Sequence, residues 1–276
     1  MASKGYVVAA IEHPESSFQD AGPFAATLYH RRRDLLYVLD QLEQLSQARV
    51  ASPFAGLADV RRTTLIGYSM GGFGTLNALG AGFSEALAGF FKAQTGNCSA
   101  IDQLCANNPA FPPLDERIVA AVVFAPWGMN YQAWTAEALA KIKTPLLIIG
   151  GDQDDISDYE KGIKAIFDQA SNSPRYLLTF QGARHNVAPN PAPPEALTSG
   201  LHIDEYLRYA DSVWDTRRMN NINQHFITAF LGQVLSPEEG YQRYLQLSPR
   251  PSNETPWEGF LPRTAVGLEL LSAGQP

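Results

Sequence analysis

The segment Thr64–Phe73 limits the fold of this chain most, because it reads as a short apolar strand running through Gly-x-Ser-x-Gly into a helix of small residues. A serine at the tip of such a turn has a strained backbone and projects its hydroxyl from the top of a sheet. We expect Gly67 and Gly71 to be required, since a Cβ at either position would collide with the neighbouring strand or helix. The following helix should point its N-terminus, with the Met70 amide, toward Ser69.

Two later segments end in the acidic and basic residues that would complete a site around this serine. Thr144–Asp154 begins as an apolar run, typical of a buried parallel strand, and ends in glycines and acids. Tyr176–His185 is a second strand-like run, which ends in Gly, Ala, Arg and His. Ser, Asp and His therefore each follow a separate buried strand, in that order. Loops at the carboxyl ends of parallel strands meet at one edge of the sheet.

These segments together resemble the dienelactone-hydrolase-like α/β-hydrolases, a group that includes bacterial cutinases, polyester hydrolases and platelet-activating-factor acetylhydrolases. The resemblance covers roughly residues 5 to 190, and its motifs are Gly67–Gly71, Gly151–Asp154, Gly182–Asn190 and Ala125–Trp127. It implies an α/β-hydrolase fold, with a mostly parallel sheet that carries helices on both faces. It also implies hydrolysis of carboxylic esters through an acyl-enzyme, with aryl and polyester compounds among the candidate substrates.

The resemblance also implies a role for individual residues. The candidate site residues are the catalytic Ser69, Asp154 and His185, the oxyanion donor Met70, and the substrate-binding residues Trp127 and Tyr68. The Gly-x-x-Asp spacing favours Asp154 as the acid, with Asp155 next, whereas Asp152 and Asp158 are interpreted as solvated loop charges. His13 follows the first predicted strand and is the other histidine that we expect near the site.

Composition excludes several classes of function. The chain has 276 residues, 45% of them hydrophobic, which is enough for a single large core. Its net charge of -7 argues against nucleic acid as a partner, because no basic patch is available to neutralise phosphates. Thr63–Ser84 carries no charge but contains six glycines, which favours a buried turn and helix over a membrane span. We expect no metal, and the incomplete glycine pattern after Gly72 argues against a nucleotide cofactor.

Apolar periodicity predicts alternating strands and helices, as in a mostly parallel sheet. The predicted strands are Gly5–Ile11, Thr63–Ile66, Ile118–Phe124, Leu146–Ile149 and Arg175–Phe180. The predicted helices are Phe24–Gln47, Gly72–Ala81, Ala136–Ile142, Tyr159–Ala170 and Asp204–Val234. Residues 1–235 are interpreted as the catalytic domain, and residues 236–276 as an extension of the same domain with a helix at Glu238–Leu247 and a strand-like run at Thr264–Leu271.

Residues 83–116 form a predicted irregular insertion, long enough to act as a lid. Cys98 and Cys105 lie within it, without the acidic or histidine pattern of a zinc site. A small disulfide loop and two free thiols are equally compatible with this spacing. No signal peptide is recognised at the start, and the family resemblance points to a secreted or periplasmic protein, so the compartment stays open.

The resemblance places Met1–Ile11 at the fourth strand of the family, so the first three strands and a loop that supplies the second oxyanion donor have no counterpart. In the family's strand order the third strand lies between the fourth and fifth, and its absence would leave a gap inside the sheet. Buried backbone groups cannot stay unpaired there. We expect the fourth strand to slide against the elbow strand, or the gap to be filled by Thr264–Leu271 or by a second copy in a homodimer.

Three functional interpretations follow from the sequence. The first is a serine hydrolase that cleaves carboxylic esters. The second is a truncated relative that retains the catalytic residues but binds without turnover or works slowly, because the second oxyanion donor is missing. The third is a lipase or peptidase of the same fold, with the insertion at 83–116 as its lid.

Overall fold

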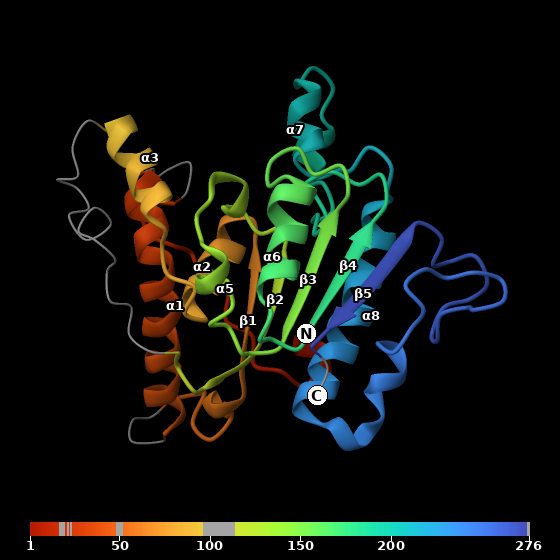
Figure 1. The fold of residues 1–276 in the computed structure, drawn as a ribbon, viewed down its shortest axis with the longest axis horizontal. Coiled ribbons are helices and arrows are strands. Elements are labelled where there is room, and N and C mark those ends of the chain that lie inside the picture. Colours follow the sequence, from red (N-terminus) through yellow and green to blue (C-terminus); the bar gives the residue numbers. More distant parts are fainter. Residues whose placement is uncertain (17–19, 21, 23, 48–51, 96–113, 275–276) are drawn as a thin grey trace.

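The computed structural model describes residues 1–276 except 17–19, 21, 23, 48–51, 96–113 and 275–276. Its centre is a five-stranded sheet in the order β1-β2-β3-β4-β5. The strands are β1 (Thr63–Tyr68), β2 (Ile118–Phe124), β3 (Leu146–Gly151), β4 (Arg175–Phe180) and β5 (Leu268–Ala273). The first four are parallel and β5 is antiparallel to β4 (Figure 1). The described chain therefore has a mostly parallel α/β architecture.

The central strands form where the sequence has uninterrupted apolar runs. Every residue of β3 and β4 is buried, as is nearly every residue of β2. Strands covered on both faces need such runs rather than an alternating pattern. The strands predicted at Ile118–Phe124 and Arg175–Phe180 are confirmed to the residue, and those at Thr63–Ile66 and Leu146–Ile149 are each two residues longer in the structure.

Helices cover both faces of this sheet. They are α1 (Phe24–Ser46), α2 (Met70–Ala78), α3 (Glu85–Thr95), α5 (Ala136–Leu139), α6 (Ala165–Gln169), α7 (Ile203–Leu207) and α8 (Thr216–Leu235). In Figure 1, α6 lies in front of the sheet and α8 behind it, while α1 stands beside α2 at the β1 end. Helix α8 buries an apolar stripe, and its Phe230 ring meets the ring of Tyr176 on β4 edge-on at 6.2 Å.

Short helical turns complete the described chain. A π-helical turn (Tyr159–Lys164) precedes α6, and the two together occupy the helix predicted at Tyr159–Ala170. The 3₁₀ turns are Ala2–Lys4, Val60–Arg62, Met129–Tyr131, Pro194–Leu197, Pro237–Glu239 and Tyr241–Tyr244. The last two stand where a single helix, Glu238–Leu247, was predicted, so that prediction is wrong in extent.

Two further predictions of local structure are wrong. The helix predicted over Asp204–Val234 is divided into α7 and α8, because Asp211 accepts the amides of Val213 and Trp214 and closes a turn between them. Asp215 then caps α8 by accepting the Arg218 amide at 2.9 Å. The insertion at 83–116 is not irregular throughout, since α3 occupies part of it. Cys98 and Cys105 lie outside the described residues.

The C-terminal strand does not fill a gap beside β1. β5 pairs with β4, at the opposite edge of the sheet, with Phe180 opposite Leu268 and Arg175 opposite Ala273. The prediction that the tail closes the sheet next to the elbow strand is therefore wrong. The physical reason is that β4 has an outer edge of its own, whose backbone groups β5 satisfies.

The strand predicted at Gly5–Ile11 is absent as well. Residues 6–13 have no regular secondary structure, and no backbone hydrogen bond joins them to another described residue. Val7 and Val8 are 47% and 59% exposed despite their strong preference for strands. This segment has not moved against β1, because β2 is the only strand paired with β1 in the described chain. Strand propensity alone cannot make a strand without a neighbour.

Candidate active site

Ser69 occupies the turn between β1 and α2 in a conformation that side chains rarely adopt. Its φ is 52° and its ψ is −113°, a strained combination for a residue other than glycine. A Cβ on Gly67 would lie 2.2 Å from the carbonyl oxygen of Gly71, so glycine is required at position 67. At Gly71, by contrast, a Cβ would meet nothing within 4 Å, so the prediction of a close contact there is wrong. The tight contact is at Gly72, against Pro126 at 2.9 Å.

Backbone hydrogen bonds fix this turn to the end of β2. The Ser69 amide donates to the carbonyl of Phe124 at 2.9 Å, and the Ser69 carbonyl accepts the Trp127 amide at 3.1 Å. The same carbonyl accepts the amide of Phe73 at 3.1 Å, which begins the hydrogen bonding of α2. Three backbone hydrogen bonds therefore hold the serine in place. Its hydroxyl makes no capping bond to helix α2.

Ser69, His185 and Asp154 form one continuous hydrogen-bonded chain. The Ser69 Oγ lies 3.0 Å from the Nε2 of His185. The Nδ1 of His185 lies 2.9 Å from Oδ2 and 3.1 Å from Oδ1 of Asp154. A carboxylate on Nδ1 holds the proton there, which leaves Nε2 free to accept the proton of the serine hydroxyl. The three residues come from the ends of β1, β3 and β4, as predicted from their order in the chain.

The Asp154 carboxylate is held rigidly where it faces the histidine. Its side chain is 0% exposed, and its Oδ1 accepts the amides of Ile156 at 2.9 Å and Ser157 at 2.8 Å. The Ser157 hydroxyl in turn donates to the carbonyl of Ala125 at 2.8 Å, which ties this loop to the end of β2. Hydrogen bonds of this kind stabilise a buried carboxylate and fix its orientation.

The neighbouring acids have other partners. Asp152 accepts the Gly182 amide at 2.6 Å, and Asp158 accepts the Lys161 amide at 2.9 Å as a helix cap. Asp155 forms an ion pair with Arg184 at the surface. Partial burial alone would raise the pKa of Asp155, but the hydrogen bond and charge of Arg184 outweigh it and hold that pKa below its usual value. Of the four acids, Asp154 is the one that contacts His185.

Helix α2 begins directly after Ser69, with Met70 as its first residue. The first amides of a helix have no partner within it, and they carry the positive end of the helix dipole. Ser69 makes no side-chain cap bond to them. The Met70 amide is therefore a suitable donor for negative charge that develops next to Ser69.

Tyr68 lies against His185. Its ring centroid is 5.2 Å from that of His185, and its hydroxyl donates to Oδ1 of Asn186 at 3.1 Å. Burial, with the charge of Asp154, raises the pKa of the Tyr68 hydroxyl, so the hydroxyl keeps its proton and stays a donor. Asn186 itself donates to the carbonyls of Leu207 and Ala210, at 2.7 and 3.0 Å. This positioning role of Asn186 was not predicted, although it directly follows the histidine in the motif.

Trp127 is next to the turn but packs mainly in the core. Its amide contacts the Ser69 carbonyl, and its ring meets the rings of Phe24 at 5.4 Å, Phe73 at 5.8 Å and Tyr131 at 5.1 Å. Only 8% of the residue is exposed. A wall position for substrate and a purely structural role both fit these contacts, so the substrate-binding role of Trp127 stays a prediction.

Two other histidines have defined surroundings. His13 Nδ1 is 2.7 Å from Oδ2 of Asp34 on α1, and His13 shares the lining of one pocket with Ser69. His225 on α8 is surrounded by the rings of Phe226, Tyr244 and Phe260, and burial lowers its pKa. Neither histidine contacts the Ser69–His185–Asp154 chain through a described hydrogen bond.

Within the described chain, no cluster of three or more His, Cys, Asp or Glu side chains has the arrangement of a metal site. None of the described helices has the length and apolar character needed to cross a bilayer. A scan against protein-family models finds no match, and a search of curated proteins finds no significant match.

Proposed function

We propose that this protein is a serine hydrolase that cleaves carboxylic esters through a covalent acyl-enzyme. The observation that supports this most strongly is the hydrogen-bonded chain from Ser69 through His185 to Asp154, with contacts of 3.0 and 2.9 Å. A serine, a base and an orienting acid in this geometry constitute an activated nucleophile. The strained backbone of Ser69 also supports the proposal. Backbone strain of about 1–3 kcal/mol is typically retained where it positions a functional group.

The reaction begins with attack by Ser69 Oγ on the ester carbonyl carbon, while His185 Nε2 takes the hydroxyl proton. The Met70 amide donates to the oxyanion that forms, and Asp154 stabilises the imidazolium. When the carbonyl re-forms, the bond to the alcohol oxygen breaks and His185 gives its proton to that oxygen. Water then attacks the acyl-enzyme with His185 as base, and the acid leaves as the proton returns to Ser69. No metal or organic cofactor is required by this scheme.

The proposed family is the dienelactone-hydrolase-like α/β-hydrolases, the group that includes bacterial cutinases, polyester hydrolases and platelet-activating-factor acetylhydrolases. The order of the catalytic residues and the mostly parallel sheet support this assignment. Aromatic side chains stand beside the site, with Tyr68 on the histidine and Tyr131 against Trp127. They favour an ester with an aryl or long acyl group, whether a small molecule or a polymer.

A second candidate is a protein that keeps this geometry but turns over slowly or not at all. The observation that favours it is the pocket beside β1, which extends past Ser69 and Met70. A second group that donates a hydrogen bond to the oxyanion would have to lie beside these two residues, where the pocket is open. Loss of one donor typically lowers turnover by about 10²–10³.

The experiment that separates these candidates is a panel of p-nitrophenyl esters with acyl chains of two, four and eight carbons, together with the matched p-nitroanilides. We expect release of p-nitrophenol by the protein, with the anilides at least 100-fold slower. An ester rate no higher than that of buffer would favour the binding candidate. Anilide rates equal to ester rates would favour a peptidase. A polyester film assayed for soluble acid would extend the test to polymers.

A further inference from the structure

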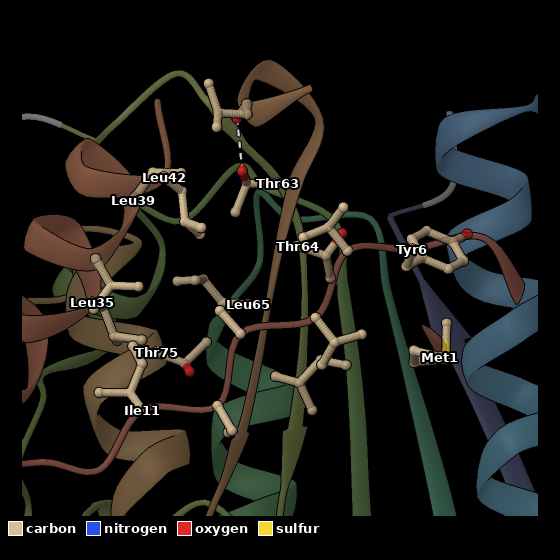
Figure 2. A pocket seen from close by; sticks show the side chains of 18 of the residues that line it. Met1, Tyr6, Ile11, Leu35, Leu39, Leu42, Thr63, Thr64, Leu65 and Thr75 are labelled. Carbon is tan, nitrogen blue, oxygen red and sulfur yellow. Dashed lines mark hydrogen bonds between the residues drawn. The ribbon is translucent and has the colours of Figure 1, made fainter. Parts of the chain in front are cut away.

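A large pocket lies beside β1, between this strand, helix α1 and the N-terminal residues. Its volume is about 870 Å³, and residues of β1 from Thr63 onward line it as far as Ser69. Figure 2 shows Thr63, Thr64 and Leu65 among the side chains around it. Six strand residues at about 3.3 Å each give a length of about 20 Å. The pocket therefore runs along the whole length of this strand.

Two backbone segments that line this pocket have hydrogen-bonding groups without a described partner. The first is β1, which is paired with β2 on one side and with no described strand on the other. A strand with one neighbour leaves the amide and carbonyl of every second residue pointing outward. The second is the segment 6–11, whose backbone makes no hydrogen bond to another described residue. Both segments leave hydrogen-bonding groups that an incoming backbone can satisfy.

The side chains around the pocket are mostly apolar. Leu35 and Leu39 of α1 lie near Leu65 of β1, while Met1 and Tyr6 lie toward α8 (Figure 2). An occupant would therefore meet apolar groups on both faces of the sheet. Strands covered on both faces have continuous apolar sequences without charge.

Two details beside β1 also indicate a missing neighbour. The Thr64 hydroxyl is buried, and no described group forms a hydrogen bond with it. A Cβ at Gly71, which lines the pocket, would meet nothing within 4 Å. The same turn is tightly packed on the other side, at Gly67 and Gly72.

We propose that this pocket binds an extended, uncharged peptide segment of a partner polypeptide, about six residues rich in Val, Ile and Thr. The peptide adds as a strand between β1 and residues 6–11, and its backbone pairs with both. An acyl chain could fill the same space, but it would leave both backbone segments without partners. The need of both backbone segments for hydrogen-bond partners, more than the apolar lining, therefore favours a peptide over an acyl chain.

The test uses two fluorescein-labelled peptides, both with the sequence Lys-Val-Ile-Val-Thr-Val-Ile-Lys and capped ends. One has ordinary amides, and the other has N-methyl groups on alternate residues, so that its side chains are the same but half its donors are lost. We expect fluorescence anisotropy to show binding of the first peptide and at least tenfold weaker binding of the second. Amide hydrogen exchange of residues 63–68 should slow at least tenfold in the first complex.

A pair of variants locates the binding. Ile66 lines the pocket and is 47% exposed, so Ile66→Lys places a charge in the pocket at a position where the fold tolerates solvent. Leu261 is 76% exposed and does not line the pocket, so Leu261→Lys is the matched control. We expect at least tenfold weaker peptide binding for Ile66→Lys and unchanged binding for Leu261→Lys, with circular dichroism confirming that both are folded.

Several results would overturn the proposal. These are binding of neither peptide, equal binding of both, unchanged exchange at 63–68, or equal effects of the two lysine variants. Palmitate that displaces the peptide without slowing exchange at 63–68 would indicate an acyl-chain pocket instead. A dimer by light scattering, with residues 63–68 already protected, would show that a second copy occupies the space. All these readouts are independent of ester hydrolysis, so they stand apart from the proposed function.

Discussion

Replacement of Ser69 by Ala is expected to abolish ester hydrolysis, with kcat lower by a factor on the order of 10⁶. The variant keeps the turn but lacks the oxygen that lies 3.0 Å from His185 and would attack the carbonyl. His185 and Asp154 then have no nucleophile to activate, and the remaining rate comes from substrate binding and the Met70 amide. The measurement is the rate of p-nitrophenyl butyrate hydrolysis by the purified variant, beside the unchanged protein at the same concentration.

The matched control for this variant is Ser171→Ala, which removes an exposed hydroxyl in the loop after α6. It should hydrolyse the ester at the rate of the unchanged protein. The thermal unfolding midpoints of both variants should stay close to that of the unchanged protein. If Ser69→Ala retained more than a tenth of the activity, another nucleophile would be responsible and the assignment of Ser69 would be wrong.

The second large effect is expected for Asp154→Asn, which should lower kcat by about 10⁴. The asparagine oxygen can still accept the amides of Ile156 and Ser157, so the loop should keep its shape. Its amide group, however, donates to Nδ1 of His185 and places the imidazole proton on Nε2. The histidine then cannot accept the proton of Ser69. The expected signature is a large fall in kcat with little change in KM or in the circular dichroism spectrum.

Asp155→Asn is the matched control, since it makes the same change one residue further along the chain. Its carboxylate pairs with Arg184 at the surface, in an ion pair whose two side chains are 43% and 55% exposed. Exposed pairs of this kind contribute little to stability. We expect less than a threefold change in kcat. A larger loss for Asp155→Asn than for Asp154→Asn would contradict the acid assigned here.

The part of the fold that could be predicted from sequence is the part whose signals are local. Ile118–Phe124 and Arg175–Phe180 are apolar runs bounded by polar residues, and such runs form buried strands wherever neighbours are available. Ser69, Asp154 and His185 could be placed together because each directly follows a strand of this kind. The choice of Asp154 among four acids came from a family spacing, and its contact with His185 agrees with that choice.

Several of the wrong predictions concern contacts between distant segments. The run Gly5–Ile11 has strand propensity, but no described strand accepts its backbone hydrogen bonds. β5 pairs with β4 rather than with β1, and neither edge is marked in the local sequence as the one that receives it. The close contact predicted at Gly71 is also wrong, because a Cβ there would meet nothing within 4 Å, and the local sequence does not show which segments lie beside a turn.

The most direct test of the central claim is to locate the covalent adduct of a fluorophosphonate ester by peptide mass spectrometry. The reagent phosphonylates a serine only where a neighbouring base activates it, and its adduct is stable. We expect one adduct per chain, on the peptide that contains Ser69, and none in Ser69→Ala, with labelling much slower in Asp154→Asn. An adduct on another serine, or ester turnover by a protein that takes up no label, would contradict it.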